Sequence, residues 1–235
     1  MDADLIADFC RSEQPAAWTP PTPEMRELQE LLHQYDVLKA ARTQVLNRLA
    51  AGFTSPIGLA QLQAQLNFLE GQLADVVKLM QAHIDRHPDL KRQHTRVAST
   101  PAQTLRCWVT GIGDLTAAKI IAADPSRFED ARAFAAYAGL TPMQTRSGSS
   151  VHWKPRLSKI GDADLRRALY MPALSAWQSN PIVQQLIERL LARGKTKMTV
   201  VGAVMHKLLV LAYGVLKSGQ PFDPHYRPLL THLAT

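Results

Sequence analysis

The stretch "LAQLQAQLNFLEGQLADVVKLM", from Leu59 to Met80, contains the most regular apolar pattern of the chain. Its apolar residues recur in alternating steps of three and four, which is the spacing of a coiled-coil seam. The seam residues are Leu59, Leu62, Leu66, Leu69, Leu73, Val76 and Met80. This spacing predicts a long helix with one apolar side, and we expect the helix to end at His87-Pro88, because a residue before proline disfavours helical dihedrals.

The residues before this stretch predict a second long helix. From Glu24 onward apolar residues again recur at intervals of three and four, until "AGFTSPIG" at 51–58 interrupts the pattern. Two long helices joined by a short loop form a helical hairpin. Its apolar seam is either buried between the two helices or also joins two subunits as a coiled coil, which would make the protein a homo-oligomer through the hairpin.

Proline content and composition divide the chain into three parts. Residues 15–23, "PAAWTPPTP", hold four prolines in nine positions and predict an extended linker after a short N-terminal helix. After Ser99-Thr100 the composition shifts to small residues, glycines and basic side chains. We therefore predict a mainly α fold with parts at 1–23, 24–98 and 99–235.

Start and stop signals predict further helices in the third part, and no series of strands is evident there. Gly139 and Gly219 are each suited to end a helix. Asp162 or Asp164 is suited to begin one, and Asn180-Pro181 to begin another. The stretch between Gly139 and these acids reads as an irregular polar loop.

Composition argues against a membrane or secreted protein. The longest apolar stretch, Val200 to Leu216, is interrupted by His206 and Lys207 and is shorter than the roughly 18 to 20 residues that a membrane span needs. The first ten residues, "MDADLIADFC", carry acids where a secretory signal carries basic residues. Only two cysteines are present, Cys10 and Cys107, which indicates neither a disulfide framework nor a zinc site. We expect a cytoplasmic protein that does not bind membranes.

The excess of positive charge lies in the second half of the chain. Residues 1–100 contain 10 Lys and Arg against 12 Asp and Glu, whereas residues 101–235 contain 17 against 8. An excess on one side suits a polyanion, most simply nucleic acid, although solubility alone can produce it. Lys195 and Lys197 form one basic turn that fits either interpretation.

The sequence Gly111-Ile112-Gly113 lies between two helical patterns. Glycines let the backbone approach a partner closely, and the free amides of the following helix favour a phosphate oxygen. The pattern "GIGxxTA" resembles a helix-hairpin-helix motif, which contacts the DNA backbone without reading its sequence. Thr116 supports this interpretation, and Lys119 is either a further phosphate contact or a solvated lysine. The alternative is an ordinary turn between helices.

The segment "TRSGSSVHWKPRLSKIGDADLRRALY", residues 145–170, combines serines with cations. Its basic residues after the first position are Arg146, Lys154, Arg156, Lys159, Arg166 and Arg167. A phosphate chain would be well neutralised here, but serine needs an activator before it attacks a phosphodiester. His152 is nearby, yet a single histidine on a basic loop is more often a surface residue. The residues alone favour a basic loop over a catalytic serine.

The order of these motifs over residues 104–224 resembles the C-terminal half of the transposases of insertion-sequence family 110 and the related Piv-type DNA invertases. The resemblance implies a DNA strand-transfer enzyme in which a serine forms a covalent phosphoserine. That serine falls on Ser147, with Ser149 and Ser150 as fallbacks. The resemblance also implies that the glycine turn and the basic residues hold DNA, and that some members use a structured noncoding RNA to choose donor and target DNA.

The resemblance further implies a Mg²⁺ site in an N-terminal RuvC-like domain with an Asp-Glu-Asp-Asp set. The last metal-binding motif of that domain reads D-x-x-D-A, and only its end, D-A, matches here, at Asp2-Ala3. The match places one metal ligand on Asp2. Asp4 stands at a spacing that the motif does not have. One aspartate cannot hold the metal. The sequence therefore predicts a bacterial, cytoplasmic transposase without most of that domain. Two functions stay open: strand transfer through Ser147, or a catalytically inactive, oligomeric module that binds DNA or RNA.

Overall fold

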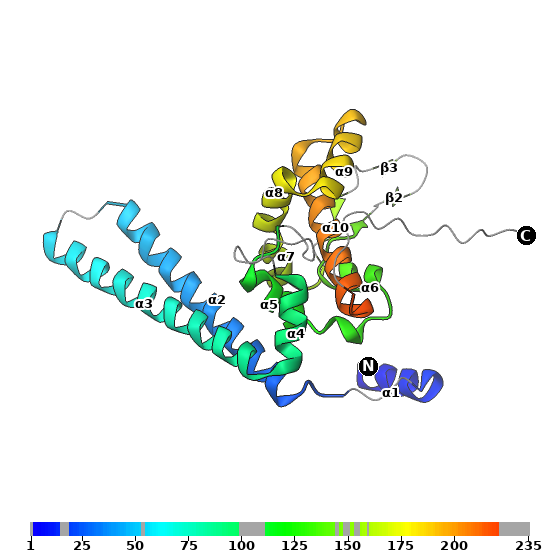
Figure 1. Cartoon of the computed structure of the whole chain (residues 1–235), viewed down its shortest axis with the longest axis horizontal. Coiled ribbons are helices and arrows are strands. Elements are labelled where there is room, and N and C mark those ends of the chain that lie inside the picture. Colours follow the sequence, from blue (N-terminus) through cyan, green and yellow to red (C-terminus); the bar gives the residue numbers. More distant parts are fainter. Residues whose placement is uncertain are drawn as a thin grey trace, which may run out of the picture.

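A long helical arm extends from a helical body in the computed structural model of the chain (Figure 1). The structure describes residues 2–14, 19–52, 55–98, 111–143, 146–147, 151–152, 156–158 and 160–220. We call helices α2 and α3 the arm, and the elements from α4 to α10 the body. Helices make up most of the described chain, so the predicted mainly α fold is confirmed.

The first helix, α1 (Asp2–Glu13), precedes the proline-rich segment, as predicted. It is exposed along its described length, including its apolar residues Leu5, Ile6 and Phe9. Cys10 on this helix is a free, exposed thiol.

The arm consists of α2 (Pro23–Ala50) and α3 (Pro56–Arg86). Each helix begins with a hydroxyl cap followed by proline: the Thr22 side chain accepts from the Met25 amide, and the Ser55 side chain accepts from the Gly58 amide. Helix α3 ends directly before His87, where the sequence predicted it. The two helices bury apolar residues of the arm, namely Leu28, Leu32, Val45, Leu62, Leu66, Leu69, Val76, Met80 and Ile84. Of the predicted seam, Leu59 is exposed. The hairpin is therefore confirmed, while the second subunit stays a prediction.

The body packs shorter helices around one long central helix, α10 (Lys197–Ser218), which contacts α4, α6, α8 and α9 (Figure 1). The other helical elements are α4 (Pro88–Val97), α5 (Asp114–Ala122), the 3-10 turn η1 (Pro125–Arg127), α6 (Ala131–Tyr137), α7 (Ala163–Ala168), α8 (Tyr170–Ser179) and α9 (Pro181–Ala192). Asp162 caps α7, Asn180 caps α9, and α10 ends at Gly219, as predicted. In the core, the Tyr213 hydroxyl lies 2.9 Å from the Phe128 carbonyl and 3.0 Å from the Glu129 carbonyl.

Among the described helices, only α10 is long and apolar enough to cross a membrane by length and composition. The residues around His206 had been expected to interrupt such a span. However, 56% of its most apolar window is buried inside the protein, where α10 supplies many of the core side chains. We therefore describe it as the core helix of the body.

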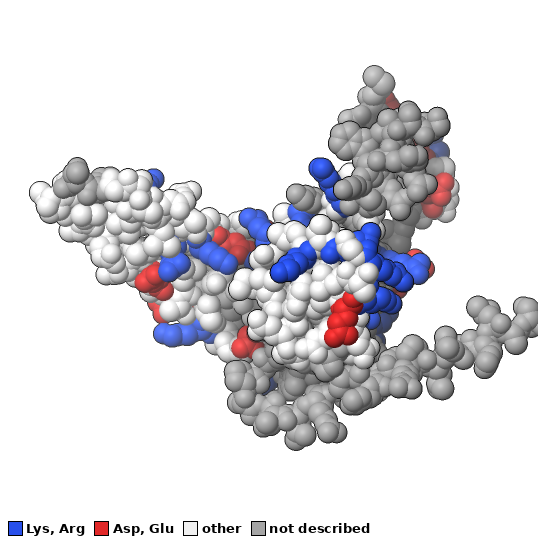
Figure 2. All heavy atoms as spheres, turned by 90° about the horizontal axis from the view of Figure 1, so that it is seen from above, with Lys and Arg blue, Asp and Glu red and all other residues white. Residues whose placement is uncertain are grey.

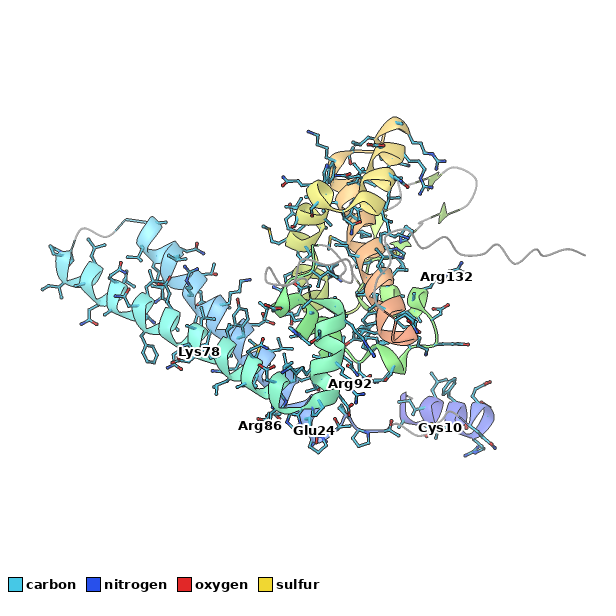
Figure 3. All side chains as sticks on the ribbon, viewed as in Figure 1. Cys10, Glu24, Lys78, Arg86, Arg92 and Arg132 are labelled. Atoms are coloured by element: carbon cyan, nitrogen blue, oxygen red, sulfur yellow. The ribbon has the colours of Figure 1, made fainter. Side chains whose placement is uncertain are left out.

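The arm and the body share a small apolar core at the root of the arm. Leu28 and Leu32 of α2 pack in one cluster with Ile121 and Ala122 of α5. The Gln29 side-chain amide donates to the Ala122 carbonyl at 2.7 Å. This core crosses the predicted boundary between residues 98 and 99, which stays a prediction like the other boundaries. In Figure 3 the labelled residues Glu24, Arg86 and Arg92 mark the root, where the start of α2 and the end of α3 meet α4.

Candidate nucleic-acid interface

The serine segment contains a short β-ribbon that the sequence had not indicated. Strands β1 (Pro142–Met143) and β4 (Arg156–Leu157) pair antiparallel, with Pro142 opposite Leu157. Strands β2 (Arg146–Ser147) and β3 (Val151–His152) also pair antiparallel, with Ser147 opposite Val151. Ser147 is thus the last paired position of β2 before the three positions 148–150. The prediction of an irregular loop is wrong where these strands pair.

The base of the ribbon is fixed to the body by close packing. The Leu157 side chain lies against Gly202 of α10, where a Cβ atom would come within 3.0 Å of it. The Ser158 amide donates to the Thr141 carbonyl at 2.9 Å. Gly161 has φ +119°, and an added Cβ would overlap the carbonyl oxygen of Tyr137, so only glycine fits at this position. These contacts give the strand pair β1–β4 a defined place beside α10.

The helix after the ribbon carries two of the predicted phosphate-binding arginines. Asp162 caps α7 by accepting from the amides of Asp164 and Leu165. Arg167 pairs with Asp164 one turn earlier, and Arg166 donates to the Ala138 carbonyl at 3.0 Å, which ties α7 to the end of α6. Arg167 also donates to the Ala163 carbonyl at 3.3 Å. Both guanidinium groups keep further donors, because an arginine has five.

The glycine turn packs against the body as closely as its sequence predicts. Gly111 has φ +110°, and a Cβ atom there would lie 2.9 Å from the Ala176 Cβ of α8. Ile112 is fully buried, and Gly113 begins α5 without a side-chain cap. The first amides of α5 are thus not capped by a side chain, but the carboxylate of Asp114 stands in the same turn. The helix that would precede this turn in a helix-hairpin-helix motif lies outside the described residues, so the motif stays a prediction.

Two predicted DNA contacts on α5 are turned inward, and we correct both. Thr116 is buried, and its hydroxyl donates to the Ala168 carbonyl at 3.4 Å. The Lys119 ammonium group lies 2.5 and 2.7 Å from the two carboxylate oxygens of Asp36 on α2. Because its charge is neutralised at the root of the arm, Lys119 joins arm to body instead of presenting a free cation.

A cleft of about 250 Å³ opens beside this ion pair, between α2 and the body. Its polar lining includes Asp36, Lys119, Tyr137 and Asp162. Burial, followed by the negative charge of Asp162, raises the pKa of Tyr137, so its hydroxyl stays protonated and lies 3.4 Å from the Asp162 carboxylate. These groups already have partners within the protein, and the cleft serves the junction of arm and body.

Several predicted residues have no described side chain. Gln144 and Thr145 and the positions 148–150 and 153–155 lie outside the described residues, as does Lys159. The predictions for Ser149, Ser150, Lys154 and Lys159 therefore fall outside the described part of the chain. For Asp2, Arg146 and Ser147 the structure gives the helix or strand but no side-chain surroundings. Arg156 is described and exposed.

Acidic metal ligands do not gather in the described part of the chain. Among these residues no group of three or more His, Cys, Asp or Glu side chains could hold a metal ion. A Mg²⁺ ion needs several oxygen ligands at fixed geometry, and Asp2, the one predicted ligand on α1, does not supply them. The described residues do not fit the Mg²⁺ site that the resemblance implies, and no chemical step is assigned to a metal here.

A mainly helical body that presents a polar ribbon and a surplus of cations is suited to hold a polyanion. Comparison with known proteins identifies the polyanion. Residues 107–188, from the glycine turn to α9 and including the whole ribbon, match the family model described as "Transposase IS116/IS110/IS902 family". This part of the chain is similar to that family of insertion-sequence transposases. The resemblance seen in the sequence is thereby confirmed, and the family resemblance points to DNA as the polyanion.

Individual relatives show how far the likeness extends. The pilin gene-inverting protein of Moraxella bovis is 28% identical over 232 residues, which cover 95% of this chain and 67% of that protein. The pilin gene-inverting protein of Moraxella lacunata matches with the same identity and coverage. The insertion element IS110 uncharacterized 43.6 kDa protein of Streptomyces coelicolor is 29% identical over 115 residues, 48% of this chain and 28% of that protein.

Proposed function

We propose that the body binds duplex DNA and that the Ser147 hydroxyl attacks a phosphodiester, forming a covalent phosphoserine. The observation that carries this proposal is the position of Ser147. It is the last paired residue of β2, which pairs with β3, and it lies inside the matched residues 107–188. A nucleophile on a paired strand has a more defined direction than one on an unpaired loop.

The reaction exchanges one phosphate ester for another, so the free energy of the phosphodiester bond is conserved. The serine Oγ forms a bond to phosphorus and gives up its proton, and the bond from phosphorus to one sugar oxygen breaks. That oxygen takes up a proton and leaves as a free hydroxyl. A second sugar hydroxyl can then attack the phosphoserine and rejoin the DNA in a new arrangement, so no external energy source is needed.

Cations around the ribbon would stabilise the negative charge on the attacked phosphate. Arg156 on β4 is exposed, and Arg166 and Arg167 lie in the last turn of α7. With Arg146, Lys154 and Lys159 they form the predicted phosphate-binding set. The uncapped amides at the start of α5 would hold the DNA backbone at a second point.

Trapping of the covalent adduct tests this proposal. The chain is incubated with Mg²⁺ and a labelled duplex containing an end of its own insertion sequence, and the products are separated under denaturing conditions. We expect an adduct from the wild-type chain and from Ser149→Ala and Ser150→Ala, but none from Ser147→Ala. An adduct that survives Ser147→Ala and disappears with Ser149→Ala would reassign the nucleophile.

A DNA-binding module without catalysis is the second candidate, favoured by the lack of an acidic cluster among the described residues. Such a module would bind DNA, or DNA together with a structured RNA, and form no adduct. Steeply salt-dependent DNA binding by a wild-type chain that gives no adduct would select this function.

We also propose that the tip of the arm joins two copies of this chain. Residues 43–69 contain a single charged residue, Arg48, although the arm projects from the body. Ile57 and Phe68 are 77% and 65% exposed there. Apolar surface without nearby charge favours a self-complementary contact. We expect a dimer by light scattering that Ile57→Lys with Phe68→Lys dissociates, whereas Leu79→Lys, nearer the root, does not. A monomer at all concentrations would overturn this proposal.

A further inference from the structure

The last three helices of the body carry almost all of their charge with one sign. Residues 170–220 contain six Lys and Arg and a single acid, Glu188. Four of the cations lie at one end of the body, where α9 turns into α10; they are Arg189, Arg193, Lys195 and Lys197. None of these four belongs to the serine ribbon or to the glycine turn.

The turn that carries these cations has a defined backbone. Gly194 has φ +70°, and its amide donates to the Leu191 carbonyl at 2.9 Å. The Lys195 amide donates to the Leu190 carbonyl at 3.1 Å, which completes a Schellman motif. Thr196 follows at once as the cap of α10, with its hydroxyl accepting from the Thr199 amide at 3.4 Å. The cations therefore project from a fixed turn, so little backbone entropy is lost when they bind a ligand.

The four cations are free to meet a ligand. All are exposed, and none has a carboxylate within ion-pair distance among the described residues. Lys119 and Arg167 differ in this respect, because each pairs with an aspartate. Figure 2 looks down on this end of the body and shows Lys and Arg side chains gathered over it, with few acids. Unpaired cations on a rigid turn are suited to a row of phosphates.

This basic end lies beside the serine ribbon. Leu157 of β4 packs on Gly202 of α10, and Lys197 is five residues earlier on the same helix. At 1.5 Å per residue the two positions are about 7 to 8 Å apart along the helix axis. One DNA duplex passing the ribbon would reach both.

From these observations we infer that the α9–α10 turn is a second DNA-backbone contact, which binds phosphates of the duplex held at the ribbon. The inference rests on the proposed DNA binding and does not depend on catalysis by Ser147. Contacts from the turn go to phosphates, so they position the duplex without reading its sequence. Arg193, Lys195 and Lys197 carry the contact, and Arg189 stands one turn behind them on α9.

Salt-dependent DNA binding tests the inference. The probe is a fluorescein-labelled duplex of several helical turns, measured by anisotropy over a range of salt concentrations. The variant Arg193→Gln/Lys195→Gln/Lys197→Gln removes three exposed charges and should fold like the wild type. Each lost phosphate contact makes the negative slope of log K against log salt shallower by about 0.9. The slope should therefore become shallower by about 2 to 3, and the affinity at low salt should fall by about tenfold or more.

A matched control separates this contact from a general loss of charge. Arg26→Gln/Lys39→Gln/Arg86→Gln removes three exposed charges from the arm and should leave the slope within about 1 of the wild-type value. Wild-type slope and affinity in the turn variant would overturn the inference and leave the proposed DNA binding intact. Absence of salt-dependent binding by the wild type would refute both. A loss confined to a structured RNA probe, with duplex binding unchanged, would also overturn the DNA assignment.

Discussion

Removing one partner of the ion pair between Lys119 and Asp36 should destabilise the junction of arm and body far more than breaking an ordinary surface pair does. The Lys119 side chain is 12% exposed and that of Asp36 is 30% exposed, and the ammonium group contacts both carboxylate oxygens. In Lys119→Met the carboxylate stays largely buried without its cation. Loss of one partner of a fully buried pair costs about 3 to 5 kcal/mol, and the remaining exposure of Asp36 reduces this to about 2 to 3 kcal/mol.

A second ion pair in the arm provides the control. Arg42 contacts the Glu70 carboxylate at 2.8 and 3.0 Å, but both side chains are more exposed than those of the first pair. Arg42→Met should cost below about 1 kcal/mol. In Lys119→Met/Asp36→Leu no charge is left buried, and stability should return to within about 1 kcal/mol of the wild type.

Urea unfolding measures these differences as the free energy of unfolding extrapolated to zero urea. An equal slope of that free energy against urea shows that the variants unfold in the same way. A cost for Lys119→Met no larger than that for Arg42→Met would refute the argument. The same variants test the correction made above for Lys119. DNA affinity of the double variant should stay within about twofold of the wild type, because no phosphate contact is lost. A tenfold loss would restore Lys119 to the DNA interface.

Three further changes have defined outcomes. Gly161→Ala should cost more than about 3 kcal/mol, since the new Cβ overlaps the Tyr137 carbonyl at a left-handed φ, whereas Gly71→Ala in open space on α3 should raise the melting temperature slightly. Tyr213→Phe should destabilise the body by about 1 kcal/mol, measured by urea unfolding, because two part-buried carbonyls lose the hydroxyl that they share. Burial, then a neighbouring lysine, lowers the pKa of His206 below 6.5, so the unfolded chain binds its proton first and stability falls as pH drops below about 6.5. His206→Gln should show a smaller loss of melting temperature than the wild type between about pH 7.5 and pH 5, and an unchanged loss would contradict this assignment.

Sequence signals located helix ends well, because those signals act locally. The end of α3 before His87, the caps at Asp162 and Asn180 and the end of α10 at Gly219 lie where the sequence placed them, since such residues constrain the backbone wherever they stand. Helix α3 begins earlier than expected, at Pro56, inside the stretch 51–58 that interrupts the apolar pattern. The heptad spacing also located most of the buried positions of α3, although Leu59 near its start is exposed.

Features that depend on long-range partners could not be predicted in this way. The ribbon consists of two-residue strands, which are too short to show alternation and are held by packing such as that of Leu157 on Gly202. The partner of Lys119 lies 83 positions away in the sequence, so the lysine resembled a free surface cation. The cations at the α9–α10 turn were visible in the sequence. Their isolation from acids and their closeness to the ribbon required the fold.

The arm has a mechanical consequence. Helix α3 has 31 residues and is therefore about 46 Å long, and the apolar cluster near the tip, around Val45 and Leu66, contains residues of the arm alone. Only the root is packed against the body. A pivot of about 10° at this root would carry the tip through about 8 Å, given the helix length. The arm is thus a lever that converts a small rearrangement beside the body into a displacement comparable to the spacing of two packed helices.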